Sequence, residues 1–164
     1  YEVVMNIAEH YKSEDMSNAA MAEELMKVNA DSLGAVGRAK FDELTGKIYP
    51  DACKKQYRAA KEAYDSGEYD TVISSLETVM QMDESYNDGA AMLLLAQGYE
   101  KKGDQDKANT TYQKIIETWP DTDVATQAQQ ALDAQSGNTD NSDSKKSDDT
   151  KKNSDNDDNG DNNN

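Results

Sequence analysis

One stretch of the sequence has residue types and spacing that match a metal-binding loop. Residues 155–160, Asp-Asn-Asp-Asp-Asn-Gly, follow the first half of a calcium-loop pattern, in which oxygen ligands at alternate positions surround the ion. The bidentate acidic residue that closes such a loop is missing before Asn164. Because the surrounding segment consists mainly of Asp and Asn, such a match arises easily by chance. We expect a solvated spacer here and no calcium site.

Three further residues are of types that take part in reactions, but none has the neighbours that a reaction requires. Cys53 is the single cysteine, which excludes an internal disulfide and a cysteine-based metal site, so we expect a small half-buried residue. His10 is the single histidine and has no second ligand or nucleophile near it in the sequence. Asn109 begins a glycosylation acceptor, Asn-Thr-Thr, inside a predicted helix, and we treat it as accidental. The sequence therefore predicts a protein that is not an enzyme and binds no cofactor or metal.

The charge of the chain disfavours partners that are rich in phosphate. The 164 residues include 33 Asp and Glu against 17 Lys and Arg, a net charge of −16. Eight Asp and four Lys give the segment from Ser136 onward a net charge of −4, so the preceding residues hold −12. Nucleic acids and anionic lipid surfaces need Lys and Arg that displace counterions. We therefore expect no nucleic-acid partner, and basic or neutral protein segments instead.

Residues 89–120 have the pattern of two helices joined by a tight turn. Apolar residues recur at helical spacing over 92–99 and again over 108–119, so each segment has one apolar face. Gly103 lies between them and allows the left-handed conformation that ends many helices. Pro120 cannot continue the second helix. The spacing predicts a helical hairpin.

This hairpin resembles the tetratricopeptide repeat, a unit of about 34 residues. The residues that carry the resemblance stand at the family's characteristic positions: Leu95, Ala96, Tyr99, Gly103, Ala108, Tyr112, Ile115 and Pro120. Ala108 also has a physical reason, because two helices approach closely only where a side chain is small. The family pattern does not explain the glycine at position 98.

A second hairpin, over residues 52–86, repeats the pattern in the same register. Gly67 precedes Gly103 by 36 residues, and the same spacing relates three apolar pairs: Val72 to Ala108, Leu76 to Tyr112, and Val79 to Ile115. Val72 stands where the family has a small residue, so we expect a looser crossing of the two helices there. Stacked hairpins of this kind share one core, because each is too small to bury its own apolar face.

The two ends of the chain complete the predicted array. Residues 1–28 form a weaker hairpin in which Glu14 replaces the turn glycine, and an extra amphipathic helix follows over 33–48. Pro50 suits the first turn of the next helix. A narrow alanine-rich face over 124–132 suits a capping helix.

We therefore predict an all-α fold, a right-handed α-α superhelix of tetratricopeptide-like hairpins with about seven helices and a disordered acidic tail. The predicted regions are a degenerate repeat plus the extra helix over 1–50, two repeats and a capping helix over 51–134, and a tail over 135–164. From Ser136 onward the tail has no aliphatic or aromatic residue, so it cannot bury enough apolar surface to offset the entropy of ordering.

The resemblance also implies a partner-binding groove on the concave face, where the first helix of each hairpin supplies the contacts. By position in the repeat, the groove residues are Tyr57, Lys61, Tyr64, Asp65, Leu93, Gln97, Glu100 and Lys101. An alternative stays open, in which the two tyrosines of this set only pack against neighbouring helices. The Lys and Asn set with which some members of the family clamp a C-terminal carboxylate is absent.

The predicted function is a non-catalytic protein-protein interaction module that binds a peptide or protein on this concave face. The repeats and the tail together look like exported or membrane-anchored proteins of the bacterial envelope, which implies an extracytoplasmic location; a cytoplasmic one is the alternative. Because the sequence begins with Tyr1 and not Met, we expect any signal peptide or anchor upstream. The longest aliphatic run, Met92 to Leu95, is too short to insert into a membrane. A rival function is structural self-association as a homo-oligomer.

Overall fold

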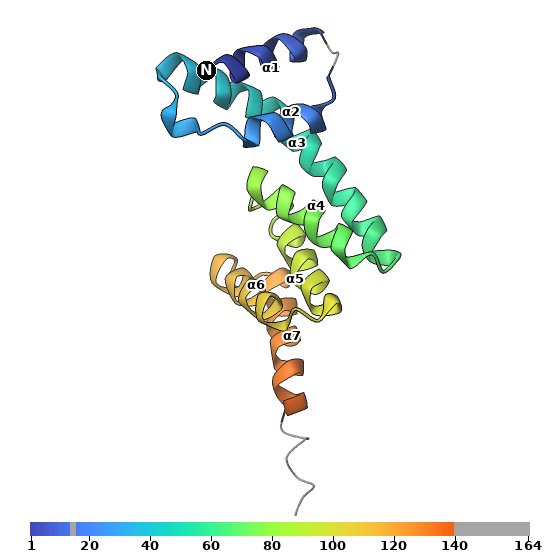
Figure 1. Ribbon diagram of the computed structural model, residues 1–164. Helices are drawn as coiled ribbons and strands as arrows, with labels where there is room; N and C mark the ends of the chain where they lie inside the picture. The colour runs from blue at the N-terminus through green and yellow to red at the C-terminus, as the bar shows by residue number, and fades with distance from the viewer. Residues whose placement is uncertain (14–15, 140–164) are drawn as a thin grey trace, which may run out of the picture.

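The computed structural model describes residues 1–13 and 16–139, and these residues form seven α-helices, one short 3₁₀ helix and no strand. The elements in chain order are α1 (Glu2–Ser13), α2 (Asn18–Met26), η1 (Ala30–Ser32), α3 (Ala35–Asp65), α4 (Tyr69–Met82), α5 (Ala90–Lys102), α6 (Gln105–Thr118) and α7 (Asp123–Thr139). Each α-helix packs against the next one along the chain, so the molecule is an elongated stack (Figure 1). The all-α fold of tetratricopeptide-like hairpins is confirmed.

The turns of the two predicted hairpins have the same backbone geometry. Gly67 and Gly103 both take the left-handed conformation, with φ of 77° and 91°. The amide that follows each glycine donates to a carbonyl five residues earlier, and in both turns the distance is 2.9 Å: Glu68 to Ala63, and Asp104 to Tyr99. This bond closes the end of a helix on a glycine. The spacing of 36 residues is therefore present in the hydrogen bonds as well as in the sequence.

Helix α3 departs most from the sequence-based expectation. We expected one helix to end near residue 48 and another to begin near 52, with Pro50 in its first turn. Instead, α3 is a single helix of 31 residues, and Pro50 lies inside it. Proline has no amide hydrogen, so the carbonyl of Gly46, four residues earlier, loses its usual donor in the helix.

The helix continues through the proline because its two halves are buried in two different cores. Leu44 and Ile48, on the N-terminal side, are at most 1% exposed. Cys53 and Ala60, on the C-terminal side, are fully buried. Burial of apolar side chains on both sides outweighs the local cost of one proline, which is about 3 kcal/mol in a helix interior.

We name these cores the N-terminal core and the repeat core. The N-terminal core is built by α1, α2 and the first half of α3, and its buried residues are Val4, Ile7, Ala8, Met21, Ala22, Leu25, Leu44, Ile48 and Ala52. The repeat core is built by the second half of α3 and helices α4 to α7, and its buried residues include Val72, Leu76, Val79, Leu93, Leu95, Tyr99, Tyr112 and Ile115. Met82 at the end of α4 packs against both cores.

Helix α7 forms the last layer of the stack. Ala125 and Ala128 bury its narrow apolar face, and it packs against α6 and α5. The helix continues to Thr139, five residues beyond the predicted boundary at 134. The rest of the predicted tail, including the Asp-rich stretch at 155–160, lies outside the described residues.

Candidate partner-binding surface

The predicted groove residues lie on two neighbouring helices. Four come from the second half of α3 and four from α5, and these helices contact each other. In this arrangement the first helix of each hairpin lies beside the first helix of the next. The predicted groove residues are therefore shared between two adjacent repeats.

On α3, both predicted tyrosines are half-buried and already have an aromatic neighbour within the chain. The Tyr57 ring lies 5.6 Å from the Tyr86 ring in an edge-to-face arrangement, and the Nζ atom of Lys61 lies 6.0 Å from the centre of the Tyr57 ring. The Tyr64 ring lies 5.7 Å from that of Tyr69. Such pairs hold the rings in fixed orientations. Part of each ring remains exposed, so packing and partner contact are compatible at these positions.

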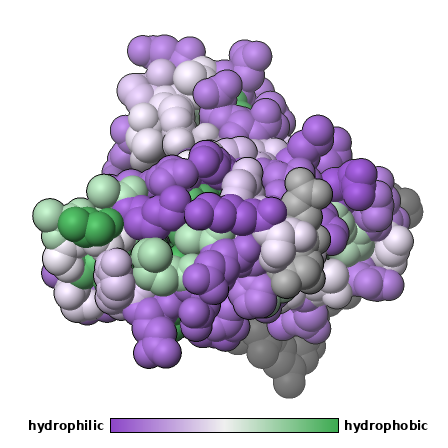
Figure 2. Space-filling view, turned by 90° about the horizontal axis from the view of Figure 1, so that it is seen from above, coloured by the Kyte–Doolittle hydropathy of each residue, from purple (hydrophilic) through white to green (hydrophobic). Residues whose placement is uncertain are grey.

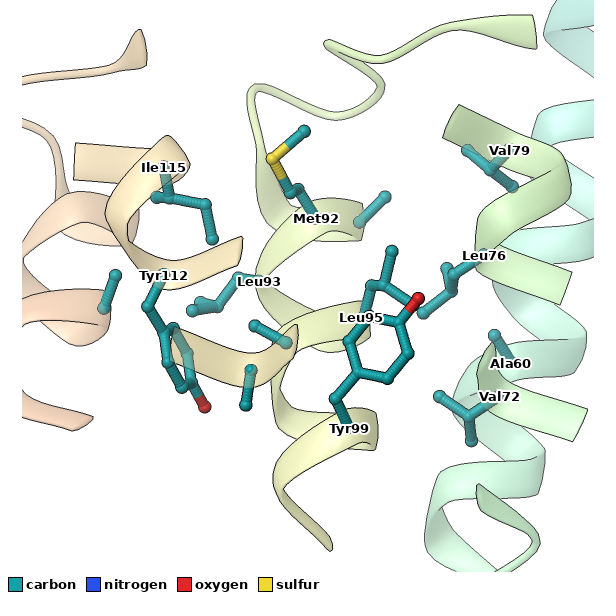
Figure 3. Close-up of a cluster of buried hydrophobic side chains, with 14 of the residues drawn as sticks. Ala60, Val72, Leu76, Val79, Met92, Leu93, Leu95, Tyr99, Tyr112 and Ile115 are labelled. Carbon is teal, nitrogen blue, oxygen red and sulfur yellow. The ribbon is translucent and has the colours of Figure 1, made fainter. Parts of the chain in front are cut away.

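On α5, the four predicted residues divide into buried and accessible ones. Leu93 is 8% exposed and points toward Tyr112 on α6 (Figure 3). It therefore belongs to the repeat core, and its burial does not support the prediction of a partner contact at this position. Gln97 and Glu100 are both half-buried and Lys101 is exposed, but the Glu100 carboxylate already accepts a hydrogen bond from Tyr112, which leaves Lys101 and Gln97. A partner that lies along α5 can reach the last two side chains.

Glu100, a predicted groove residue, also accepts a hydrogen bond from a buried tyrosine through its carboxylate. The hydroxyl of Tyr112 on α6 donates to Oε2 of Glu100 at 2.7 Å. In the same way, the hydroxyl of Tyr99 on α5 donates to Oε1 of Glu77 on α4 at 2.6 Å. Burial, followed by the hydrogen bond to the carboxylate, raises the pKa of each tyrosine above its ordinary value. These two bonds satisfy the hydroxyl groups of tyrosines that are otherwise in apolar surroundings.

The contact between Val72 on α4 and Gly98 on α5 joins the two hairpins. A Cβ atom at Gly98 would lie 3.0 Å from Cγ1 of Val72, which is tighter than normal packing. The space needed by the larger residue therefore comes from the absent side chain of Gly98. Val72 is fully buried, and the expected looser crossing of α3 and α4 at this position stays a prediction. Sequence reasoning noted both residues as departures but did not connect them.

A similar close approach joins the two ends of the hairpin over residues 89–120. Gly89 has φ of 86° at the start of α5, and a Cβ atom there would lie 2.9 Å from the Trp119 ring after α6. The left-handed conformation and the tryptophan both favour glycine at this position. The ring thus covers the point where α5 begins.

Three of the residues considered first for chemistry, His10, Cys53 and Asn109, lie on the separate helices α1, α3 and α6. Residues 1–13 and 16–139 contain no group of three or more His, Cys, Asp or Glu placed to hold a metal ion. Cys53 is fully buried, more than the half-buried residue we expected, and burial followed by the nearby Asp83 carboxylate raises the pKa of its thiol to about 11. Asn109 lies within α6.

No described helix is both long and apolar enough to cross a membrane.

Comparison with known families gives a match to the hairpin formed by α5 and α6. Residues 90–122 match the tetratricopeptide repeat family. The tetratricopeptide match runs over α5, the Gly103 turn, α6 and Pro120, so it coincides with the hairpin on which the resemblance was based. We call residues 90–122 the matched repeat and residues 52–82 the preceding hairpin. Comparisons with curated proteins and with solved structures gave no significant match.

Proposed function

We propose that this protein is a non-catalytic scaffold that binds a peptide or protein segment on the concave surface between α3 and α5. The observation that carries the proposal is the matched repeat, because tetratricopeptide repeats are generally protein-protein interaction modules. The preceding hairpin has the same turn geometry 36 residues earlier, so two such units lie side by side. Stacked helical repeats generate extended concave surfaces of this type.

The side chains on this surface suit a segment that has both apolar and polar residues. Tyr57 and Tyr64 present partly exposed aromatic faces, while Gln97 and Lys101 offer polar groups on the neighbouring helix. Tyrosine gives a large, rigid contact area with one polar end. The tyrosines would therefore anchor the segment, and the α5 residues would fix its register.

Site-specific photocrosslinking tests the concave surface. A photoreactive residue is placed at Gln97 or Lys101 in one set of proteins, and at the exposed Gln113 of α6 in the matched control. We expect a discrete crosslinked partner from the α5 positions, lost when Tyr57→Ala and Tyr64→Ala are added, and none from the control. Equal crosslinking from α5 and α6, or no effect of the tyrosine changes, would contradict the proposed surface.

Self-association is the second candidate, and one observation favours it. Three of the exposed large hydrophobic residues of the described chain line one hollow where α1 meets the start of α3: Tyr1, Met5 and Val36. Val36 is 74% exposed, and the view onto this end shows hydrophobic residues among hydrophilic ones (Figure 2). Light scattering over a concentration series separates the two functions. A mass that rises with concentration and is restored to that of a monomer by Val36→Lys would support self-association.

We further propose an extracytoplasmic location in a bacterial envelope assembly. The support is the resemblance of the repeats and the Asp/Asn/Ser/Lys-rich tail to proteins of that compartment. Protease treatment of intact cells that produce the full-length protein tests the location. Digestion in intact cells is the expected result, and protection until the cells are lysed would contradict it.

A further inference from the structure

Two hollows lie beside Tyr49, at the point where α3 passes from the N-terminal core to the repeat core. The first has a volume of about 330 Å³ and is lined by Gly46, Tyr49, Pro50, Met82, Asp83 and Tyr86, among others. The second has a volume of about 390 Å³, and its walls include Met26, Val28, Phe41 and Tyr49. Tyr49 belongs to both, so the hollows are adjacent. We call the first one the Pro50 cleft.

The Pro50 cleft exists because α3 is continuous. Pro50 has no amide hydrogen, so the carbonyl of Gly46 lacks its usual helical donor. Gly46 has no side chain to fill the space, and a Cβ atom built there meets nothing within 4 Å. The cleft lies at the C-terminal end of α4 and along the middle of α3. Its lining residues differ from those of the concave surface between α3 and α5, although Tyr86 in the cleft packs against Tyr57 of that surface.

The one charged group among the described residues that line the cleft is the carboxylate of Asp83. Asp83 is exposed, and its Oδ1 atom accepts from the backbone amide and the hydroxyl of Ser85, at 3.0 and 2.8 Å. Within the described residues Asp83 forms no ion pair, so its charge is not neutralised. No Lys or Arg lines the cleft. The Asp83 carboxylate, the Gly46 carbonyl without its usual helical donor and the rings of Tyr49 and Tyr86 line one cleft, and these groups suit a cation.

The aromatic rings also select the type of cation. Tyr49 and Tyr86 stand at the cleft, and the edge-to-face contact with Tyr57 holds the Tyr86 ring in place. A guanidinium group is planar, stacks on aromatic rings and donates several hydrogen bonds, whereas an ammonium group is compact and strongly hydrated. The cleft therefore suits arginine better than lysine.

The geometry points to the Pro50 cleft as a docking site for an arginine side chain from a basic protein segment, with an adjacent apolar residue of that segment in the hollow beside Phe41. The net charge of −16 favours a basic partner over an acidic one. This inference rests on the proposed function as a protein-binding scaffold. It adds the chemistry of the partner, and it places an anchor outside the concave surface.

A short blocked peptide tests the site without knowledge of the natural partner. The probe is N-acetyl-Leu-Arg-amide, and its control is the same peptide with citrulline, which keeps the shape of arginine but lacks the charge. The full 164-residue chain is titrated with each peptide and followed by amide chemical shifts in NMR spectra. We expect shifts around Gly46 and Asp83 with the arginine peptide, at least tenfold weaker binding of the citrulline peptide, and weaker binding at higher salt.

Two variants sharpen the test. Gly46→Leu places a side chain in open space within the helix, so it should fill the cleft without loss of thermal stability and abolish binding. Asp83→Asn keeps an oxygen for the Ser85 bonds but removes the charge, and it should weaken binding about tenfold. Asp133→Asn on α7 makes the same change in net charge far from the cleft in the stack and should have no effect.

Several results would overturn the inference. Wild-type affinity in Gly46→Leu, or equal binding of the arginine and citrulline peptides, would exclude the cleft as an arginine site. Shifts confined to Gln97 and Lys101 would place the peptide on the concave surface instead. Shifts at the cleft that depend on protein concentration without peptide would indicate a second copy of the chain as the occupant. If the arginine peptide does not bind the cleft but crosslinks are still obtained from the α5 positions, the proposed function stands and only the arginine site is excluded.

Discussion

The preceding hairpin and the matched repeat share one backbone plan but differ at the position where their helices cross. The matched repeat has Ala108 there, and the preceding hairpin has Val72; both are fully buried. The larger Val72 fits because Gly98, on the first helix of the matched repeat, has no side chain. A departure from the pattern in one hairpin is thus compensated by a departure in the next. The two hairpins should therefore be treated as one packed unit.

The largest expected effects come from the two core residues that occupy the same position in the two hairpins. Leu76→Ala and Tyr112→Ala each remove a side chain that is at most 1% exposed. We expect losses in the free energy of unfolding of about 2–5 kcal/mol for Leu76→Ala and about 3–5 kcal/mol for Tyr112→Ala, measured by urea denaturation. If the hairpins form one unit, each variant should shift the whole helical signal. A biphasic transition in either variant would separate the hairpins.

The next prediction compares two glycines with the same backbone conformation. Gly89 and Gly103 have φ of 86° and 91°, but only Gly89 has the Trp119 ring within 2.9 Å of a Cβ position. Gly103→Ala should cost about 1–2 kcal/mol, from backbone strain alone. Gly89→Ala should cost about 2–4 kcal/mol, because the displacement of Trp119 adds to the strain. Equal losses in thermal denaturation would show that the ring moves freely.

A double-mutant cycle tests the compensation itself. Gly98→Ala should destabilise by about 1–2 kcal/mol, because the new methyl group meets Cγ1 of Val72 at 3.0 Å. In the Val72→Ala background the same change should cost little, since the contact is gone and alanine favours a helix. The expected coupling energy is about 1 kcal/mol or more. Additive effects of the two substitutions would refute the compensation.

The smallest effect at neutral pH is expected for the tyrosine hydroxyls. Tyr99→Phe and Tyr112→Phe each remove one hydrogen bond to a glutamate, and we expect losses of about 0.5–1.5 kcal/mol each at pH 7. The folded protein raises the pKa of both tyrosines above the ordinary value of 10.0. Their contribution is therefore fully present below pH 10 and is lost as the pH rises from there toward the folded-state pKa.

The fall in the free energy of unfolding at high pH distinguishes the two tyrosine–glutamate hydrogen bonds from ordinary packing. Unfolding in urea between pH 7 and pH 11 should show wild-type stability falling above about pH 9, where the Cys53 thiol ionises in the unfolded chain, and falling more steeply above pH 10, by up to about 1.4 kcal/mol per pH unit for each of the two tyrosines. The double Phe variant should lose the two tyrosine contributions above pH 10 and keep the loss that begins near pH 9, although it is less stable at pH 7. An unchanged slope in the variant would assign the alkaline loss to other groups.

Local sequence signals predicted the repeat region well because its turns and faces are set by residues close together in the chain. Gly67 and Gly103 predicted both turns, and the hydrogen bonds that follow them confirm the spacing of 36 residues. The role of Gly98 could not be predicted in the same way. It depends on a contact with Val72 across two helices, and only the packed structure shows it.

Helix α3 shows where local signals were insufficient. Pro50 has a strong preference for a first helical turn, and this preference led us to expect a break between two helices. Burial in two separate cores, on either side of the proline, overrides it. For the same reason, the sequence did not indicate the Pro50 cleft. The predicted groove residues were located on adjacent helices, but their contact with a partner stays a prediction.

The continuity of α3 also links the two cores in their unfolding. At about 1.5 Å per residue, its 31 residues extend for roughly 46 Å, and each core contributes part of the packing that keeps this one helix intact. If either core melts, its half of the helix frays and the other core loses its neighbouring turns. We therefore expect the N-terminal bundle and the repeats to denature cooperatively, with a single calorimetric peak.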